Sequence, residues 1–105
     1  MAGYRIAFEE MEWETPAAFV RVKKVSVGSR VMRLVEFRRG FVEEEWCSKE
    51  HAGYVIEGSL RVEFAGGATA ELREGDGIEI PPGPEHGHKA TPLTESVLLI
   101  LFEPA

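Results

Sequence analysis

Apolar and polar residues alternate along short stretches of the chain, and glycine or proline separates one stretch from the next. The clearest pair covers residues 60–65 and 68–73, where apolar residues alternate with arginine and glutamate. An alternation of period two places the apolar side chains on one face of a strand. Gly66 and Gly67 accept the positive φ angles of a tight turn, so the pair predicts a β-hairpin with one face toward a core.

Similar stretches recur along the rest of the chain, and no segment shows a helical stripe over ten or more residues. Many short strands with turns between them are typical of a sandwich or barrel, and closing a barrel hides the sheet edges. We therefore predict an all-β fold. Its further strands are expected at residues 18–25, 31–38, 41–47, 54–57, 78–80, 86–91 and 95–103.

Size and charge narrow the classes of function. The 105 residues suffice for one domain, 1–105, with a core of its own. The net charge of −6 argues against binding to nucleic acid or to an anionic membrane, because both need a basic surface. The longest apolar run, residues 97–102, is too short to cross a bilayer and fits a buried strand.

Cys47 is the single cysteine, so no intrachain disulfide can form. That fits a reducing compartment. Residues 1–10 contain no long apolar stretch, so no signal peptide is expected. We predict a cytoplasmic protein.

The residues with the most distinctive chemistry gather in two short windows, 43–51 and 81–88, which hold the single cysteine and all three histidines. Glu45 and Cys47 are two residues apart, as are His86 and His88. On strands, residues two apart point to the same face, so thiolate, imidazole and carboxylate could converge inside a barrel. These groups bind zinc and other first-row metals.

Structural alternatives stay open at this point. Cys47 could be a small buried apolar residue, and His51 could lie on an exposed turn. His88 could be a ligand, a pocket group or a rim residue. Glu43 and Glu44 have the pattern of a solvated charge run.

A nucleophilic pair of Cys47 with His51 or His86 is also conceivable. However, the residues that flank Cys47 match none of the local sequence signatures of cysteine proteases that we can apply.

The second window resembles the second motif of the cupin family: a glycine, five residues, proline, one residue, glycine, two residues and histidine. Gly75, Pro81, Gly83 and His86 fit this spacing, whereas Ala90 replaces the terminal asparagine. The resemblance implies a cupin β-barrel, that is, a jelly roll or double-stranded β-helix.

The first cupin motif is recognisable but altered. Counting back from Gly58, His51 stands where the family has glutamate, Cys47 where it has its second histidine, and Glu45 where it has its first. Gly40 lies one residue from the expected opening glycine. Together the two motifs span about half of the chain.

Cupins usually bind a metal through three histidines and one glutamate, so the resemblance implies a rebuilt site with Cys47, His51 and His86 as ligands. Glu45 would be a fourth ligand or a general base, and His88 a proton-transferring pocket group. A thiolate favours zinc, with iron, nickel or copper possible. One cysteine and two histidines would leave a coordination position open for substrate.

The resemblance implies a metal-dependent enzyme acting on a small polar metabolite. The alternatives are a module that binds or senses a metabolite or a metal without catalysis, and a barrel that has lost its metal. For the enzyme and for the binding or sensing module, the expected partner is a small molecule. Residues 1–20 form an apolar N-terminal arm or strand, and we predict that they pair two chains in a homodimer.

Overall fold

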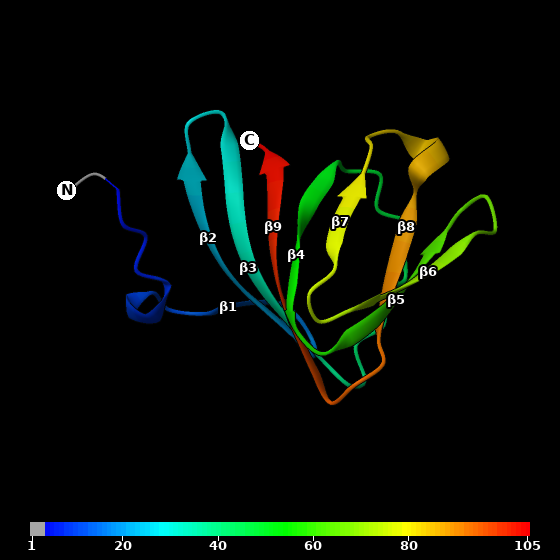
Figure 1. Ribbon diagram of the computed structural model, residues 1–105, viewed down its shortest axis with the longest axis horizontal. Coiled ribbons are helices and arrows are strands. Elements are labelled where there is room, and N and C mark those ends of the chain that lie inside the picture. Colours follow the sequence, from blue (N-terminus) through cyan, green and yellow to red (C-terminus); the bar gives the residue numbers. More distant parts are fainter. Residues whose placement is uncertain (1–3) are drawn as a thin grey trace.

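The computed structural model describes residues 4–105, and the first three residues of the predicted N-terminal arm lie outside the described residues. Short strands and two 3₁₀ helices make up the ordered elements of this part of the chain (Figure 1). The 3₁₀ helices are η1 (Phe8–Glu10) and η2 (Pro84–His86). The strands are β1 (Glu14–Ala17), β2 (Val20–Val27), β3 (Arg30–Arg38), β4 (His51–Glu57), β5 (Ser59–Phe64), β6 (Thr69–Arg73), β7 (Gly77–Ile80), β8 (His88–Pro92) and β9 (Ser96–Pro104).

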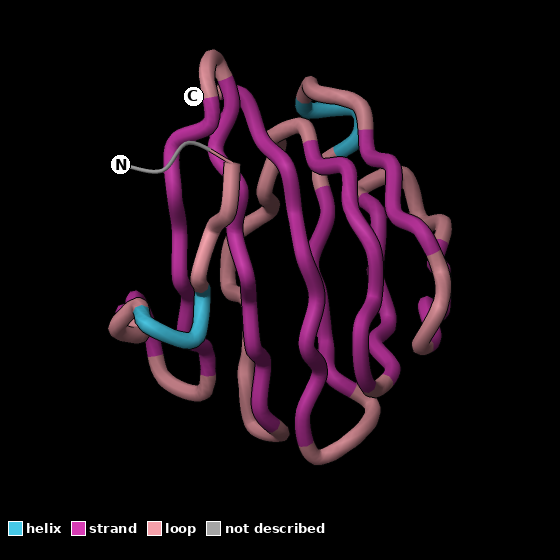
Figure 2. Tube along the Cα trace, turned by 60° about the vertical axis from the view of Figure 1, so that its left-hand side comes forward, coloured by secondary structure: helices cyan, strands magenta, loops and turns pink. Residues whose placement is uncertain are grey.

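The strands form two sheets, and every pair of neighbouring strands is antiparallel. One sheet has the order β1-β2-β3-β9-β4-β7, and the other has the order β6-β5-β8. The last strand of the chain therefore lies between β3 and β4 (Figure 1). Figure 2 shows the long strands running side by side with turns at both ends. The prediction of an all-β barrel of the jelly-roll type is confirmed.

Most of the predicted strands are present with shifted ends, but the prediction for residues 41–47 was wrong. This segment is extended loop, and only Cys47 forms a bridge, to His88. The strand β1 lies within the predicted N-terminal arm or strand, residues 1–20, but its four residues are all exposed, so no alternation of apolar and polar positions marks its ends. His86 was placed on a strand but lies in η2, since Pro84 starts a 3₁₀ turn there.

Inward-facing apolar residues of both sheets form one core. On β9 the buried or half-buried residues Val97, Leu99 and Leu101 recur with period two, and Glu103 continues the same phase. The remaining buried apolar residues of the core are Val20, Val22, Val35, Val55, Leu60, Val62 and Ile80.

Gly53 allows β4 and β9 to approach closely. A Cβ atom at this position would lie 1.9 Å from the carbonyl oxygen of Ile100. A larger residue would therefore push the two strands apart. Because Gly53 lies two residues after His51 on β4, this close pairing also fixes the start of the strand that carries His51.

The N-terminal arm folds back onto the outer face of β2. The Lys23 ammonium donates a hydrogen bond to the carbonyl oxygen of Phe8 at 2.6 Å. The Arg21 guanidinium lies 4.2 Å from the ring centroid of Trp13. Part of the apolar surface of the arm is therefore covered by its own chain.

Glu36 of β3 binds two arginines, Arg21 across the strand pair on β2 and Arg38 on its own strand. Arg21 lies directly across the strand pair and donates to both carboxylate oxygens, at 2.8 and 3.2 Å. Arg38 donates to Oε1 at 3.1 Å. Burial alone would raise the pKa of Glu36, but the hydrogen bonds and charges of the two arginines outweigh it, so the pKa falls below 4.5.

We expect Glu36→Gln to lower the free energy of unfolding by about 0.5–1 kcal/mol at neutral pH. Because the folded-state pKa is lowered, the unfolded chain binds the proton first as the pH falls. The contribution of Glu36 is thus fully present above pH 4.5 and is lost as the pH falls through the folded-state pKa. Urea unfolding of the parent and the variant across this range measures the effect. Glu57→Gln, at an exposed position, is the control. A difference between the parent and Glu36→Gln that does not shrink in acid would contradict the assignment.

Candidate metal centre

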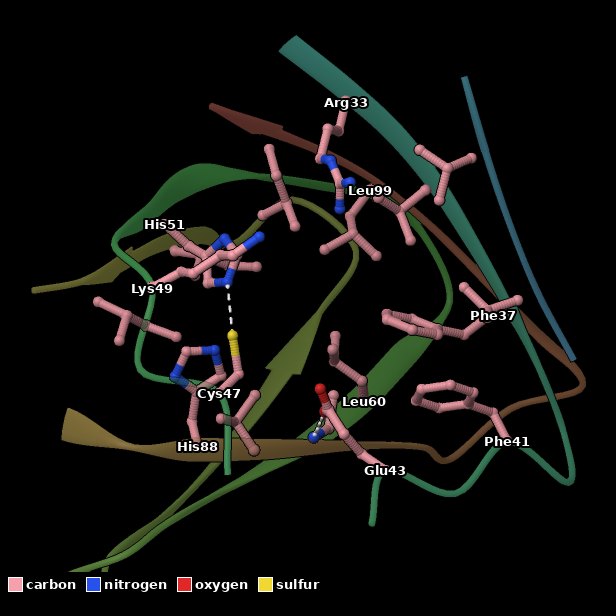
Figure 3. Close-up of a pocket in the computed structure, with 18 of the residues that line it drawn as sticks. Arg33, Phe37, Phe41, Glu43, Cys47, Lys49, His51, Leu60, His88 and Leu99 are labelled. Carbon is pink, nitrogen blue, oxygen red and sulfur yellow. Dashed lines mark hydrogen bonds between the residues drawn. The ribbon is translucent and has the colours of Figure 1, made fainter. Parts of the chain in front are cut away.

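A cavity of about 290 Å³ opens between the two sheets. Its walls are mostly apolar side chains, among them Val35 of β3, Leu99 of β9 and Leu60 of β5. Figure 3 shows Cys47, His51 and His88 gathered at one end, with Phe37 and Phe41 at the other. The polar chemistry of the cavity is therefore concentrated away from its aromatic end.

The three side chains at the polar end have a spacing that suits a metal ion. One ligand atom from each of Cys47, His51 and His88 lies within 4.8 Å of the other two. The Cys47 Sγ atom is 3.6 Å from His51 Nε2, and the two imidazole centroids are 5.0 Å apart (Figure 3). Both histidines are buried and Cys47 is half-buried, so the group is shielded from bulk water.

Backbone pairing holds this group in place. Cys47 and His88 lie opposite one another and exchange both backbone hydrogen bonds, at 3.0 and 2.9 Å. The loop that contains Cys47 thus adds one bridge to the free edge of β8. His51 is the first residue of β4 and is paired with Ile80 of β7. The segment that carries Cys47 and His51 and the distant segment that carries His88 therefore meet at one end of the barrel.

The second nitrogen of His51 faces a buried carboxylate. His51 Nδ1 lies 2.9 Å from Glu103 Oε2, and each of these fully buried atoms has no other polar partner within residues 4–105. Arg33 Nε lies 3.1 Å from the other oxygen of Glu103. A carboxylate in this position favours the tautomer with the proton on Nδ1, which leaves the Nε2 lone pair directed at Cys47.

The pKa shifts agree with this arrangement. Burial alone would raise the pKa of Glu103, but the contact with His51 and the charge of Arg33 outweigh it, and the pKa is lowered. Burial is the main cause that lowers the pKa of His88 below 6.5. Glu103 is therefore ionised and His88 neutral near pH 7, as carboxylate orientation and metal ligation require.

His88 has a tautomer suited to ligation as well. Its Nδ1 lies 3.2 Å from the backbone carbonyl oxygen of His86, which favours a proton on Nδ1 and leaves Nε2 free. His88 had been predicted as a pocket group, with ligation left open. The structure brings it into the group of possible ligands.

The structure does not bring His86 and Glu45 into this group. His86 lies half-buried in η2, outside the strand that begins at His88, and its ligand role stays a prediction. Glu45 is exposed at a bend of the loop between Glu43 and Cys47, and its catalytic role stays a prediction. Because η2 ends at His86 and β8 begins at His88, it is His88 and not His86 that lies beside Cys47 and His51.

Four charged residues that line the cavity were not predicted as site residues: Arg33, Glu43, Lys49 and Glu103. Glu43 was assigned to a solvated run, but its Oε1 accepts a hydrogen bond from the Ala90 amide at 2.8 Å (Figure 3). A usable signal existed for Glu103 and Arg33, since each continues the inward-facing phase of an otherwise apolar strand. A charged residue at such a position needs a buried partner.

The donor set fits a zinc ion. Zinc–sulfur bonds of about 2.3 Å and zinc–nitrogen bonds of about 2.0–2.1 Å place sulfur and nitrogen about 3.6 Å apart in a tetrahedron. The Cys47–His51 distance has this value. Thiolate and imidazole favour zinc or later first-row metals over magnesium and calcium. Small shifts of His88 would complete three corners of a tetrahedron.

No helix within the described residues has the length and apolar character needed to span a membrane.

No curated protein matches the sequence. Among solved structures, KdgF from Halomonas sp. is similar, with 27% identity and a TM-score of 0.74 over 92% of this chain and 91% of its own.

Two further structures support the fold alone. The polyketide cyclase RemF from Streptomyces resistomycificus is 21% identical, with a TM-score of 0.78 over 96% of this chain and 78% of its own. A sugar phosphate isomerase from Silicibacter pomeroyi is 13% identical, with a TM-score of 0.80 over 97% of this chain and 76% of its own. The family profile of the cupin domain matches residues 34–102, well over half of the chain. Because this profile matches more than half of the chain, and because the chain folds into the β-barrel expected of the family, the chain belongs to the cupin family.

Proposed function

We propose that the chain is a metal-dependent enzyme that acts on a small metabolite, with the ion held by Cys47, His51 and His88. The convergence of these three ligand atoms within 4.8 Å, backed by Glu103 on His51, is the observation that carries the proposal. Zinc is the favoured ion, with iron, nickel or copper as alternatives. A thiolate ligand must stay reduced, so we infer a reducing compartment such as the cytoplasm.

A bound ion would supply Lewis acidity toward a carbonyl or carboxylate oxygen, or activate a water molecule. With three protein ligands, the ion would keep a coordination position for the substrate. Catalysis also needs a group that moves a proton and is not consumed as a ligand.

Glu43 can serve as that group. It is half-buried, lines the same cavity, and uses one carboxylate oxygen to accept from Ala90. Its other oxygen makes no hydrogen bond or ion pair within the part of the chain that the structure describes. The presence of such a base favours an enzyme over a module that only binds a metabolite or a metal. Glu45, being exposed, lacks this position.

We also propose that the chain forms a homodimer through the N-terminal arm. β1 is an edge strand with four exposed residues, and the adjacent Phe19 is 54% exposed. An open edge of this kind can pair with a second strand.

Sedimentation equilibrium should give the mass of two chains, and the mass of one chain would contradict the proposed homodimer.

The ligand set is tested by metal analysis of untagged protein. The zinc-loaded parent should retain about one ion per chain after passage over a chelating resin. Cys47→Ser, His51→Gln and His88→Gln should each lose most of the ion, because each removes a direct ligand. His86→Gln is the matched control and should retain the ion, since His86 lies outside the group. Circular dichroism checks that every variant is folded.

Two outcomes would contradict this ligand set. If His86→Gln loses the ion while His88→Gln retains it, the ligand implied by the family spacing is right and His88 is not a ligand. If the folded parent binds no transition metal, the proposed metal centre is wrong.

Glu103→Gln tests the carboxylate behind His51. The substitution keeps the shape of the side chain but removes its charge, so the His51 Nδ1 proton no longer faces a carboxylate. We expect the zinc affinity to fall about 10–100-fold, measured by competition with a chelating dye. Glu36→Gln removes a carboxylate from the other face of the same sheet and should leave the affinity unchanged. A folded Glu103→Gln variant with parental affinity would show that Glu103 has a structural role only.

A further inference from the structure

The cavity beyond the metal ligands has two ends of different chemistry. At one end the rings of Phe37 and Phe41 form an aromatic wall, with centroids 4.6 Å apart and planes tilted by 37°. Leu60 and Leu99 continue this apolar surface. Figure 3 places these rings opposite the group of Cys47, His51 and His88. A ligand that spans the cavity therefore needs an apolar body and a polar head.

The end that holds the metal group also carries two cationic side chains, Arg33 and Lys49. Arg33 uses Nε to contact Glu103, while its terminal nitrogens make no hydrogen bond within residues 4–105. Lys49 makes no ion pair among the described residues, and its exposed side chain lines the cavity. Because Glu103 already pairs with Arg33, the ammonium of Lys49 is a positive charge at this end that no ion pair within the described residues engages.

Glu43 sets a limit on the charge of the ligand. Its carboxylate lies on the cavity wall between the metal group and Phe41 (Figure 3). A second anionic group directed along the cavity would meet this carboxylate and the aromatic wall, and both disfavour it. Glu43 and the aromatic wall therefore restrict the negative charge of a ligand to the end of the cavity that carries Lys49.

We propose that the cavity binds small monocarboxylates with an aromatic or branched aliphatic body. The carboxylate contacts Lys49 and the free nitrogens of Arg33, and the body packs against Phe37 and Phe41. A volume of about 290 Å³ lies at the small end of ligand pockets, so the ligand is a single-ring or similarly compact acid. Turnover of such a ligand would rest on the proposed metal centre, which lies at the same end of the cavity as Lys49 and Arg33.

The test uses three probes: 3-phenylpropionate, its neutral amide, and the dicarboxylate glutarate. Isothermal titration calorimetry measures the binding of each to the zinc-loaded protein and to the metal-depleted protein. We expect the acid to bind at least about tenfold more tightly than the amide, because a charge-assisted hydrogen bond is lost in the amide. Glutarate should bind more weakly than 3-phenylpropionate in both states.

Variants test whether the contact with Lys49 is the cause of the preference for the acid over the amide. Lys49→Gln should remove most of the preference for the acid over the amide, and Lys49→Arg should restore it. Lys24→Gln is the matched control, since Lys24 is exposed on β2 and does not line this cavity. Phe41→Ala should weaken the binding of acid and amide by the same factor, because it removes only apolar contact.

The outcomes separate this inference from the proposed function. If the protein binds zinc but shows no preference for the acid, the ligand class is wrong and the metal centre stands. If zinc does not bind but the acid preference depends on Lys49, the ligand class stands and the metal centre is wrong. Acid binding that needs zinc and is unchanged in Lys49→Gln would place the carboxylate on the metal and overturn the assignment to Lys49.

Discussion

The contact between Glu103 and His51 is the interaction on which the rest of the site depends. Glu103 occupies the inward phase of β9, where its neighbours in that phase are apolar, and burial of an isolated carboxylate there would be costly. Arg33 on one side and His51 on the other offset that cost. As a consequence the imidazole is oriented before any ligand arrives, with Nε2 toward Cys47.

The strands turn this contact into a three-sided site. β9 lies between β3 and β4, so the two residues that contact Glu103 come from its two neighbours, Arg33 from β3 and His51 from β4. The bridge between Cys47 and His88 then positions the remaining two side chains by backbone hydrogen bonds rather than by side-chain packing. A site built this way keeps its geometry because each ligand belongs to a paired backbone segment.

The alternation of apolar and polar residues was enough to predict the barrel, because one face of nearly every strand is buried. It failed at β1, whose residues are all exposed, and at residues 41–47, of which Phe41, Glu43 and Cys47 line the cavity without forming a strand. The clustering of cysteine and histidine identified Cys47 and His51. The family spacing chose His86 as the third ligand and His88 as a pocket group, whereas the structure places His88 beside Cys47 and His51, because Pro84 starts a 3₁₀ turn that holds His86 outside the strand. Glu103 became a site residue only when the register placed it against His51.

The central claim is that one cysteine and two histidines hold a single ion with a position left open. X-ray absorption at the zinc edge of the loaded protein tests it most directly. The account predicts one sulfur at about 2.3 Å and two imidazole nitrogens at about 2.0–2.1 Å, with the remaining scattering from a light atom of solvent or ligand. A shell without sulfur would contradict the account, as would a shell with more than one sulfur, because this chain has a single cysteine.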